Sequence, residues 1–210
     1  MTRDTVVLVH GLWMHGVAML LMKRRIARCG YRVVTYSYPT VRLDMEENAQ
    51  RLSRYCERLD PGGRIHFVGH SLGSCVAVKA AQRLPASRLG RLVLLGPPFT
   101  GSYSARRVQR LPGGRSIVGR CIDQWLAAAR PMSASVEIGV IAGNRRFGLG
   151  CIFAPGLPLP NDGVVSVAET RIPGMRDHIV LGVSHTAMLV SSNVVRQVCA
   201  FLRDGKFDRA

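Results

Sequence analysis

The chain has 210 residues, 47% of them hydrophobic, and carries 29 lysine and arginine residues against 13 acidic ones, a formal net charge of +16. This composition suits one globular domain, and the longest apolar run, around Val17 to Met22, is too short to cross a bilayer. The charge favours anionic partners, but no nucleic-acid-binding motif accompanies it, so no specific nucleic-acid binding is expected. An ordinary arginine-rich surface and weak association with anionic lipid surfaces are the two interpretations left open.

Apolar, β-rich runs alternate with helical patterns along the chain. The expected strands are Thr5–Gly11, Tyr31–Tyr38, Arg64–Gly69, Arg91–Gly96, Val136–Gly143 and Asp177–Val183. The expected helices are Val17–Cys29, one that opens with the capping signal at Asp44, Leu72 to about Leu84, and about Ser191 to Leu202. Strands separated by helices predict a parallel sheet, and right-handed crossovers place helices on both of its faces. The fold class is therefore α/β and doubly wound, in one domain over residues 1–210.

Two stretches interrupt this alternation. Residues 97–135 contain basic helical pieces around Ser104–Leu111 and Ile117–Ala129, and residues 144–161 form a loop rich in glycine and proline. Loops this long in a compact domain are often functional. The apolar residues of the second loop either line an acyl pocket or pack beneath the loop; they are Phe147, Leu149, Ile152, Phe153, Leu157 and Leu159.

The cysteines and the start of the chain bear on the compartment. The six cysteines are scattered without a C-x-x-C pair, and several fall in helix or strand patterns; they are Cys29, Cys56, Cys75, Cys121, Cys151 and Cys199. We interpret them as free thiols, which favours a reducing cell interior. A strand that begins at Thr5 leaves no room for a signal peptide. The expected location is the cytoplasm.

One short motif carries chemistry. The stretch VGHSLG, residues 68–73, follows a strand pattern and precedes a helical one. A strand that turns sharply into a helix holds the residue at the turn in a strained conformation and needs small residues two positions away. Gly69 and Gly73 meet that need around Ser71. The pattern predicts a nucleophile elbow that exposes Ser71.

A serine nucleophile needs a base, and the base needs a buried carboxylate. His185 follows the last expected strand, where a loop residue reaches the carboxyl edge of an open sheet; an ordinary surface histidine is the alternative. Asp162, in LPNDGVVS, is the favoured acid, with turn formation in Asn-Asp-Gly as its alternative role. Asp123, in a helical pattern, and Asp177, at a strand start, are weaker candidates.

An oxyanion that forms on the substrate needs two backbone N–H donors. One comes from the residue after the nucleophile, here Leu72, and the other from a loop after an early strand. Leu12, in VLVHGLW, is placed to supply the second donor.

With these residues in place, the sequence resembles the small bacterial lipases and esterases of the α/β-hydrolase superfamily. The matching pieces are VVLVHGLW, VGHSLG, NDGVVS and SHTAML, in the chain order Ser, Asp, His, and they span nearly the whole chain. The resemblance implies the α/β-hydrolase fold with a reduced, mostly parallel sheet of about six strands. The stretch 97–135 is longer than in the most minimal lipases, which leaves room for a small cap.

The motifs and the resemblance together predict a serine hydrolase that cleaves a small acyl ester through an acyl-enzyme. Ser71 attacks, His185 transfers the proton, Asp162 orients His185, and the amides of Leu12 and Leu72 bind the oxyanion. No metal-ligand spacing appears, so no metal or organic cofactor is expected. Thioesterase, lactonase or acyltransferase activity uses the same residues, and a catalytically silent binding protein is the alternative from another class.

Overall fold

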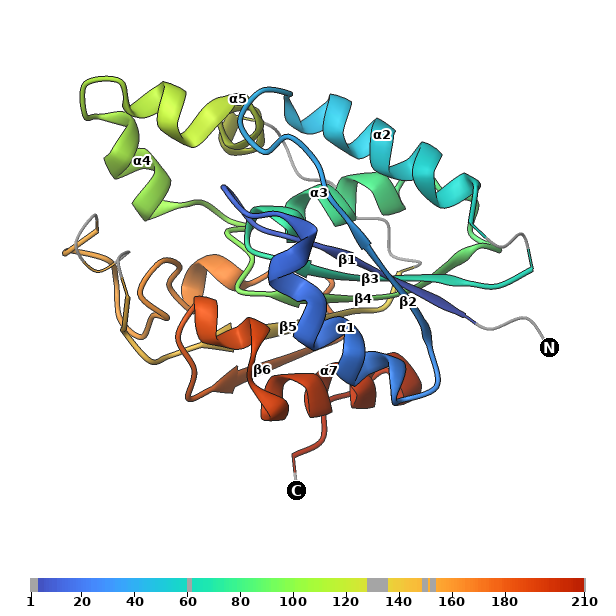
Figure 1. Ribbon diagram of the computed structural model, residues 1–210. Coiled ribbons are helices and arrows are strands. Elements are labelled where there is room, and N and C mark those ends of the chain that lie inside the picture. The colour runs from blue at the N-terminus through green and yellow to red at the C-terminus, as the bar shows by residue number, and fades with distance from the viewer. Residues whose placement is uncertain (1–3, 60–61, 128–135, 149–150, 152–153, 210) are drawn as a thin grey trace.

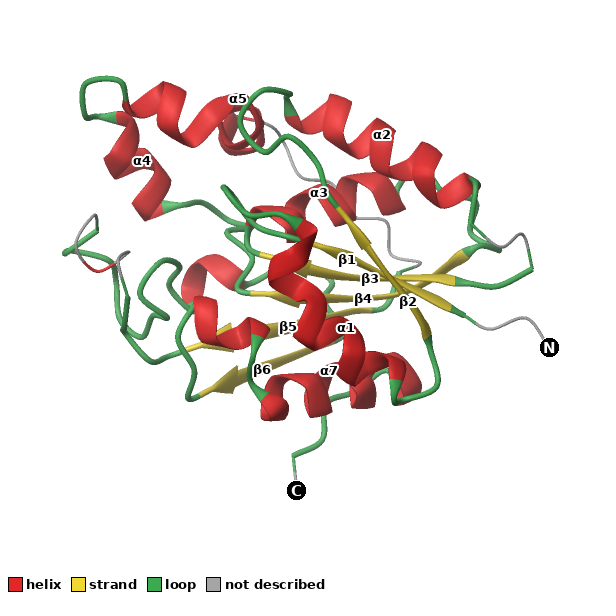
Figure 2. Cartoon of the chain, viewed as in Figure 1, coloured by secondary structure: helices red, strands yellow, loops and turns green. Residues whose placement is uncertain are grey.

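The structure is a computed structural model that describes residues 4–59, 62–127, 136–148, 151 and 154–209. Within these residues six strands form one parallel sheet in the order β2-β1-β3-β4-β5-β6 (Figures 1 and 2). The strands are β1 (Thr5–Val9), β2 (Arg32–Tyr36), β3 (Ile65–His70), β4 (Leu89–Leu95), β5 (Ile138–Gly143) and β6 (Asp177–Leu181). The predicted parallel sheet is confirmed.

Helices cover both faces of this sheet. The α-helices of the described residues are α1 (Leu20–Ala27), α2 (Met45–Glu57), α3 (Leu72–Ala81), α4 (Tyr103–Gln109), α5 (Gly114–Ala127) and α7 (Ser192–Asp204). Figure 1 shows α2, α3 and α5 on one side of the sheet and α1 and α7 on the other. Short 3₁₀ helices are η1 (Gly16–Met19), η2 (Ala168–Thr170) and η3 (Thr186–Leu189). No helix among the described residues is long and apolar enough to span a membrane.

The alternation of side chains along the strands divides the core into two layers. In β1, Val7 and Val9 pack with α2 and α3, whereas Val6 and Leu8 pack with α1 and α7. Successive strand residues point to opposite faces and both faces are covered, so every residue of β1, β3 and β5 is buried. This buried sheet is the rigid platform on which the loops at its carboxyl edge are held.

Several predicted boundaries differ from the observed ones. The first strand ends at Val9 rather than Gly11, and the expected helix 17–29 is divided into η1 and the shorter α1. Helix α2 begins as predicted, because Asp44 and Glu47 form a reciprocal capping box. Helix α5 is interrupted at Gly119, whose φ of 77° is not helical. A Cβ on this residue would lie 2.5 Å from the Cα of Val41, so no side chain fits there. The end of the expected helix 117–129 lies outside the described residues.

One prediction about the cysteines is wrong. Cys29, just after α1, and Cys199, in α7, form a disulfide across 170 residues of sequence. Their distance in the chain hides this pairing, because the contact exists only once α1 and α7 pack on the same face of the sheet. Cys56, Cys75, Cys121 and Cys151 form no disulfide within the described residues. Burial raises the pKa of Cys56 and Cys121 to about 12, which makes both inert.

Reduction of this disulfide is expected to lower the free energy of unfolding by about 2–5 kcal/mol, because the cross-link restricts the unfolded chain over a long loop. Urea unfolding with and without a reductant measures the effect. A Cys29→Ser variant should start from the lower stability and show no response to the reductant. An unchanged urea midpoint for the reduced wild-type protein would contradict this role.

Candidate active site

Ser71 lies at the sharp turn between β3 and α3, at the carboxyl edge of the sheet. Its φ of 53° and ψ of −125° are strained for a residue with a side chain, and its N–H donates to the carbonyl of Leu95 at 2.8 Å. The turn requires both motif glycines. A Cβ on Gly69 would lie 2.4 Å from the Cα of Ser74. A Cβ on Gly73 would lie 2.3 Å from the carbonyl oxygens of Val9 and His10, at the end of β1. The strained turn predicted from G-x-S-x-G is therefore present.

Asp162 and His185 lie together at the same edge. Nδ1 of His185 and Oδ2 of Asp162 are 2.6 Å apart, and both side chains are buried. The other carboxylate oxygen of Asp162 accepts the N–H groups of Val164 and Val165 at 2.9 and 2.8 Å. The backbone joins the pair again, since the N–H of His185 donates to the carbonyl of Asp162 at 2.9 Å.

The electrostatics of this pair assign the protons. Burial alone would raise the pKa of Asp162, but the adjacent His185 and the two backbone N–H donors outweigh it and hold the pKa below its ordinary value. Asp162 is therefore ionised at neutral pH and can only accept hydrogen bonds. A hydrogen bond to this carboxylate requires a proton on Nδ1 of His185, which leaves Nε2 as the ring nitrogen that can act as a base.

His70, the residue before Ser71, holds His185 from the other side. Its Nε2 donates to the carbonyl oxygen of His185 at 3.0 Å, and the two rings lie 4.7 Å apart. His70 is only 2% exposed, and its Nδ1 has no hydrogen-bond partner in the described part of the chain. Sequence reasoning noted His70 only as a motif neighbour. Its role depends on a contact across 115 residues, which no local pattern indicates.

Acid should destabilise the protein partly through His70. Burial, followed by the nearby His185, lowers the pKa of His70 from 6.5 to about 3. Between these values the unfolded chain binds a proton that the folded chain does not, so stability falls as the pH falls from 6.5 toward 3, by up to about 1.4 kcal/mol per unit. Urea unfolding at several pH values measures this slope.

His70→Gln is the informative variant, because its amide also donates but does not titrate. It should show a smaller loss of stability in acid than the wild-type protein. His10, His66 and His178 also have lowered pKa values and keep part of the slope in the variant. Equal slopes for both proteins would contradict the assignment to His70.

The turn after β1 lies against the elbow. The N–H of Met14 donates to the carbonyl of Gly11, and a Cβ on Gly11 would lie 3.2 Å from the Cβ of Ser71. Leu12 and Trp13 are the two central residues, and the φ of Trp13 is 58°, as the second of them requires in a type II turn. Leu72 opens α3, so its N–H has no partner within that helix. Both predicted donors thus belong to segments that flank Ser71.

A glycine that sequence reasoning missed separates the elbow from the Asp–His pair. Gly96 follows β4, the strand between β3 and β5. A Cβ there would lie 3.1 Å from Oδ2 of Asp162 and 3.1 Å from Nδ1 of His185, and its φ is 53°. Gly96 thus lets the pair approach the elbow across the end of β4. Within the described residues, no hydrogen bond joins Ser71 to His185.

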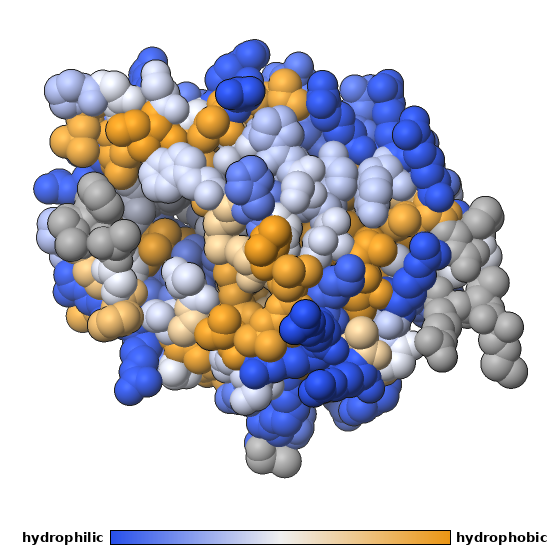
Figure 3. All heavy atoms as spheres, viewed as in Figure 1, coloured by the Kyte–Doolittle hydropathy of each residue, from blue (hydrophilic) through white to orange (hydrophobic). Residues whose placement is uncertain are grey.

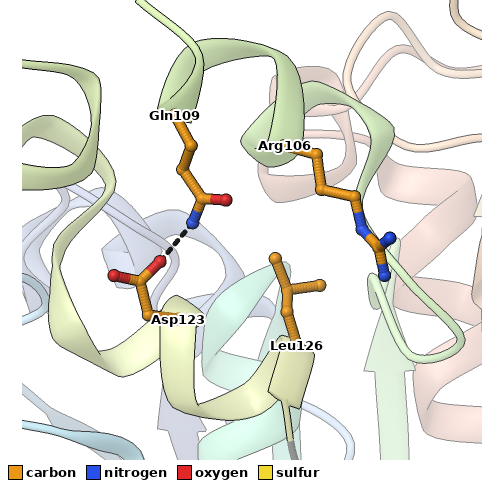
Figure 4. A pocket seen from close by; sticks show the side chains of 4 residues that line it. All are labelled: Arg106, Gln109, Asp123 and Leu126. Carbon is orange, nitrogen blue, oxygen red and sulfur yellow. Dashed lines mark hydrogen bonds between the residues drawn. The ribbon is translucent and has the colours of Figure 1, made fainter. Parts of the chain in front are cut away.

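The two rival carboxylates lie elsewhere. Asp123 accepts a hydrogen bond from Gln109 in a cavity of about 300 Å³ between α4 and α5, lined by Arg106, Gln109, Asp123 and Leu126 (Figure 4). Asp177 opens β6, at the edge of the sheet opposite Ser71, and pairs with Arg209. The structure therefore brings His185 together with Asp162 and not with either rival.

The long loop after β5 is only partly described. Phe147 and Leu159 are both 75% exposed, whereas Leu157 is 4% exposed. Leu149, Ile152 and Phe153 lie outside the described residues. The expectation that these residues line an acyl pocket therefore stays a prediction.

Comparison with known proteins shows which family has this fold. A family model described as the alpha/beta hydrolase family matches residues 6–167. The chain belongs to the alpha/beta hydrolase family. Its structure is similar to the mature form of the Bacillus licheniformis lipase BlEst2, with a TM-score of 0.78 and 18% identity over 96% of this chain and 91% of that one.

Two further solved structures are similar in fold. The metagenomic carboxyl esterase MGS0156 has a TM-score of 0.64 and 21% identity over 87% of this chain and 64% of that one. The pyrethroid hydrolase PytH has a TM-score of 0.70 and 17% identity over 97% of this chain and 98% of that one. At these identities the TM-scores show a shared fold and no more.

Proposed function

We propose that this protein is a serine hydrolase of small carboxylic esters that acts through an acyl-enzyme. The observation that carries the proposal is the buried Asp162–His185 pair, joined at 2.6 Å at the same sheet edge as the strained Ser71. Nucleophile, base and orienting carboxylate are the three groups that acyl transfer to a serine requires. Lipases and esterases among proteins of the same fold support the substrate class.

The reaction follows from the proton positions. Ser71 Oγ attacks the acyl carbonyl while Nε2 of His185 takes its proton, and the ionised Asp162 stabilises the imidazolium that forms. The N–H groups of Leu12 and Leu72 donate to the oxyanion. His185 then returns the proton to the leaving alcohol. Water, deprotonated by His185, attacks the acyl-enzyme, and His185 returns that proton to Ser71 Oγ as the acid is released.

A fluorophosphonate probe tests the nucleophile. The probe should form one adduct, located on Ser71 by peptide mass spectrometry, and a Ser71→Ala protein should stay unlabelled. A wild-type protein that is folded but unlabelled would contradict the proposal and favour the silent binding protein. Rates on an ester, a thioester and a lactone with the same acyl group then separate the possible acyl substrates.

The compartment and the cap also belong to this proposal. The sequence predicts the cytoplasm, but part of its premise was that all six cysteines are free. The Cys29–Cys199 disulfide supports an oxidising compartment instead. Alkylation of the protein before extraction from its host, followed by mass spectrometry, decides between them, since cytoplasmic protein would carry the label on Cys29.

Helices α4 and α5, within 97–135, are the part of the chain that would form a small cap.

A further inference from the structure

A surface beside the proposed site combines exposed aliphatic side chains with unpaired cations. Its apolar members are Val17, Leu20, Leu21 and Val190, and its cations are Lys23, Arg24, Arg25 and Arg28. We call this set the α1 surface. In Figure 3 apolar side chains gather where Figure 1 shows α1, and charged side chains border them below.

The apolar members are exposed to a degree that packing does not explain. Val17 is 73% exposed, Leu20 and Leu21 are each 40% exposed, and Val190 is 54% exposed. The core-facing side of the same segment is already occupied, since Met19, Met22 and Ile26 are fully buried. The exposed aliphatic side chains are therefore additional to those that the fold needs, and such patches mark interaction sites.

The cations occupy the continuation of the same helix face. Leu20, Arg24 and Arg28 follow one another at intervals of four residues, so they form one exposed row along α1 and just beyond it. Arg25 reaches across to the carbonyl of Val190 at 2.5 Å, which joins the segment after η3 to α1. The α1 surface thus has an aliphatic half and a cationic half.

These positive charges are not neutralised by the protein. Residues 5–43 contain no acidic side chain, but they contain Lys23, Arg24, Arg25, Arg28, Arg32 and Arg42. Within the described residues, none of the four cations of the α1 surface lies within 4.0 Å of a carboxylate. Arginines elsewhere, such as Arg91, Arg176 and Arg196, do form such pairs. The local excess of positive charge is therefore uncompensated, and Arg24 and Arg28 are exposed to solvent while Lys23 and Arg25 are half-buried.

We propose that the α1 surface docks on an anionic lipid bilayer, with its aliphatic side chains at the level of the acyl chains and its cations on the headgroups. Each half matches one layer of that partner. Burial of the exposed Leu and Val side chains at the acyl boundary stabilises binding, and the negative surface potential attracts the Arg and Lys side chains. A nucleic acid would use the cations but has no place for the aliphatic side chains. Trp13, four residues before Val17 and 62% exposed, is held by the hydrogen bond from its indole N–H to the carbonyl of Ile117 at 2.9 Å, so it reports on lipid contact at the η1 end of this surface.

This proposal goes beyond the hydrolysis proposed above and does not depend on it. The aliphatic half adjoins the site through two segments, because η1 follows the turn of Leu12 and Val190 follows His185 by five residues. Docking would therefore bring the carboxyl edge of the sheet close to the membrane. Binding is measured on a Ser71→Ala protein, so that lipid hydrolysis does not enter the result.

The experiment compares sedimentation with vesicles of phosphatidylcholine alone and vesicles that also contain phosphatidylglycerol. Binding should require phosphatidylglycerol and weaken with added salt. Arg24→Gln with Arg28→Gln should weaken it about thirtyfold, given the usual contribution of each cation near an anionic membrane. Val17→Ser with Leu21→Ser should weaken it about tenfold through lost apolar burial. These exposed positions do not contribute to the core, and circular dichroism checks that the variants fold.

The matched control removes two arginines from the other face of the sheet. Arg51 and Arg54 on α2 are exposed, and Arg51→Gln with Arg54→Gln should change vesicle binding by less than about twofold. An equal loss in this control would mean that only net charge matters and would overturn the proposal. Binding insensitive to the Val17 and Leu21 changes, or equally tight binding to a DNA duplex, would also overturn it.

Native fluorescence supplies a second readout. The chain has two tryptophans, and Trp125 is 1% exposed, so a Trp125→Phe protein reports on Trp13 alone. Phosphatidylcholine brominated on its acyl chains, mixed with phosphatidylglycerol, should quench Trp13 on binding. Sedimentation with these vesicles but without quenching would show docking by another face and would overturn the proposal.

Discussion

Replacement of Ser71 by alanine is expected to lower kcat for ester hydrolysis by about four orders of magnitude or more while the fold is retained. The triad residues act as a unit, so removal of the nucleophile leaves only the weak residual catalysis of the oxyanion donors. The fold should persist because the strained turn is held by its backbone contacts and by the small glycines on either side. Alanine at Ser71 removes only a hydroxyl group that has no hydrogen-bond partner among the described residues. A soluble aryl ester, assayed with protein of checked circular dichroism, measures the loss.

Ser74→Ala is the matched control for this variant. Ser74 lies three residues further into the same elbow, and its hydroxyl donates to the carbonyl of Gly69 at 2.8 Å. Loss of that bond should cost about 1 kcal/mol of stability with little change in rate per folded molecule. If Ser71→Ala kept activity within about tenfold of the wild-type protein, the nucleophile would have to be another residue.

Asp162→Asn is expected to reduce turnover about a thousandfold or more near neutral pH. An amide at this position can donate to Nδ1 of His185, which would hold the ring in the tautomer whose Nε2 is protonated and cannot accept the serine proton. It also removes the negative charge that stabilises the imidazolium. Rates on one soluble ester, corrected for the folded fraction, measure the change.

Asp123→Asn and Asp177→Asn are the controls, since both carboxylates lie away from His185. Their turnover should stay near that of the wild-type protein, although Asp177→Asn loses an ion pair with Arg209. If Asp162→Asn lowered stability but not the rate per folded molecule, Asp162 would be a turn residue only. If Asp123→Asn lost turnover while folded, the acid would lie between α4 and α5.

The features that sequence alone determined are those whose cause is local. Strand and helix patterns predict the parallel α/β sheet because both depend on the spacing of apolar residues along one segment. At the elbow the cause is local for Gly69, where a Cβ would meet the backbone of Ser74 and Gly73, whereas the contact that requires Gly73 comes from the end of β1. The capping box at Asp44 depends on four residues and was predicted for the same reason.

What only the tertiary structure decided involves residues that are distant in the chain. Asp162 could be chosen over Asp123 and Asp177 only as a preference, until packing of the loops after β5 and β6 placed it 2.6 Å from His185. No local sequence pattern indicates three other contacts: the hydrogen bond from His70 to the His185 carbonyl, the close approach of the Asp162–His185 pair to Gly96, and the Cys29–Cys199 disulfide. Each depends on which strands and helices become neighbours, and that arrangement is set by burial of the whole core rather than by any one segment.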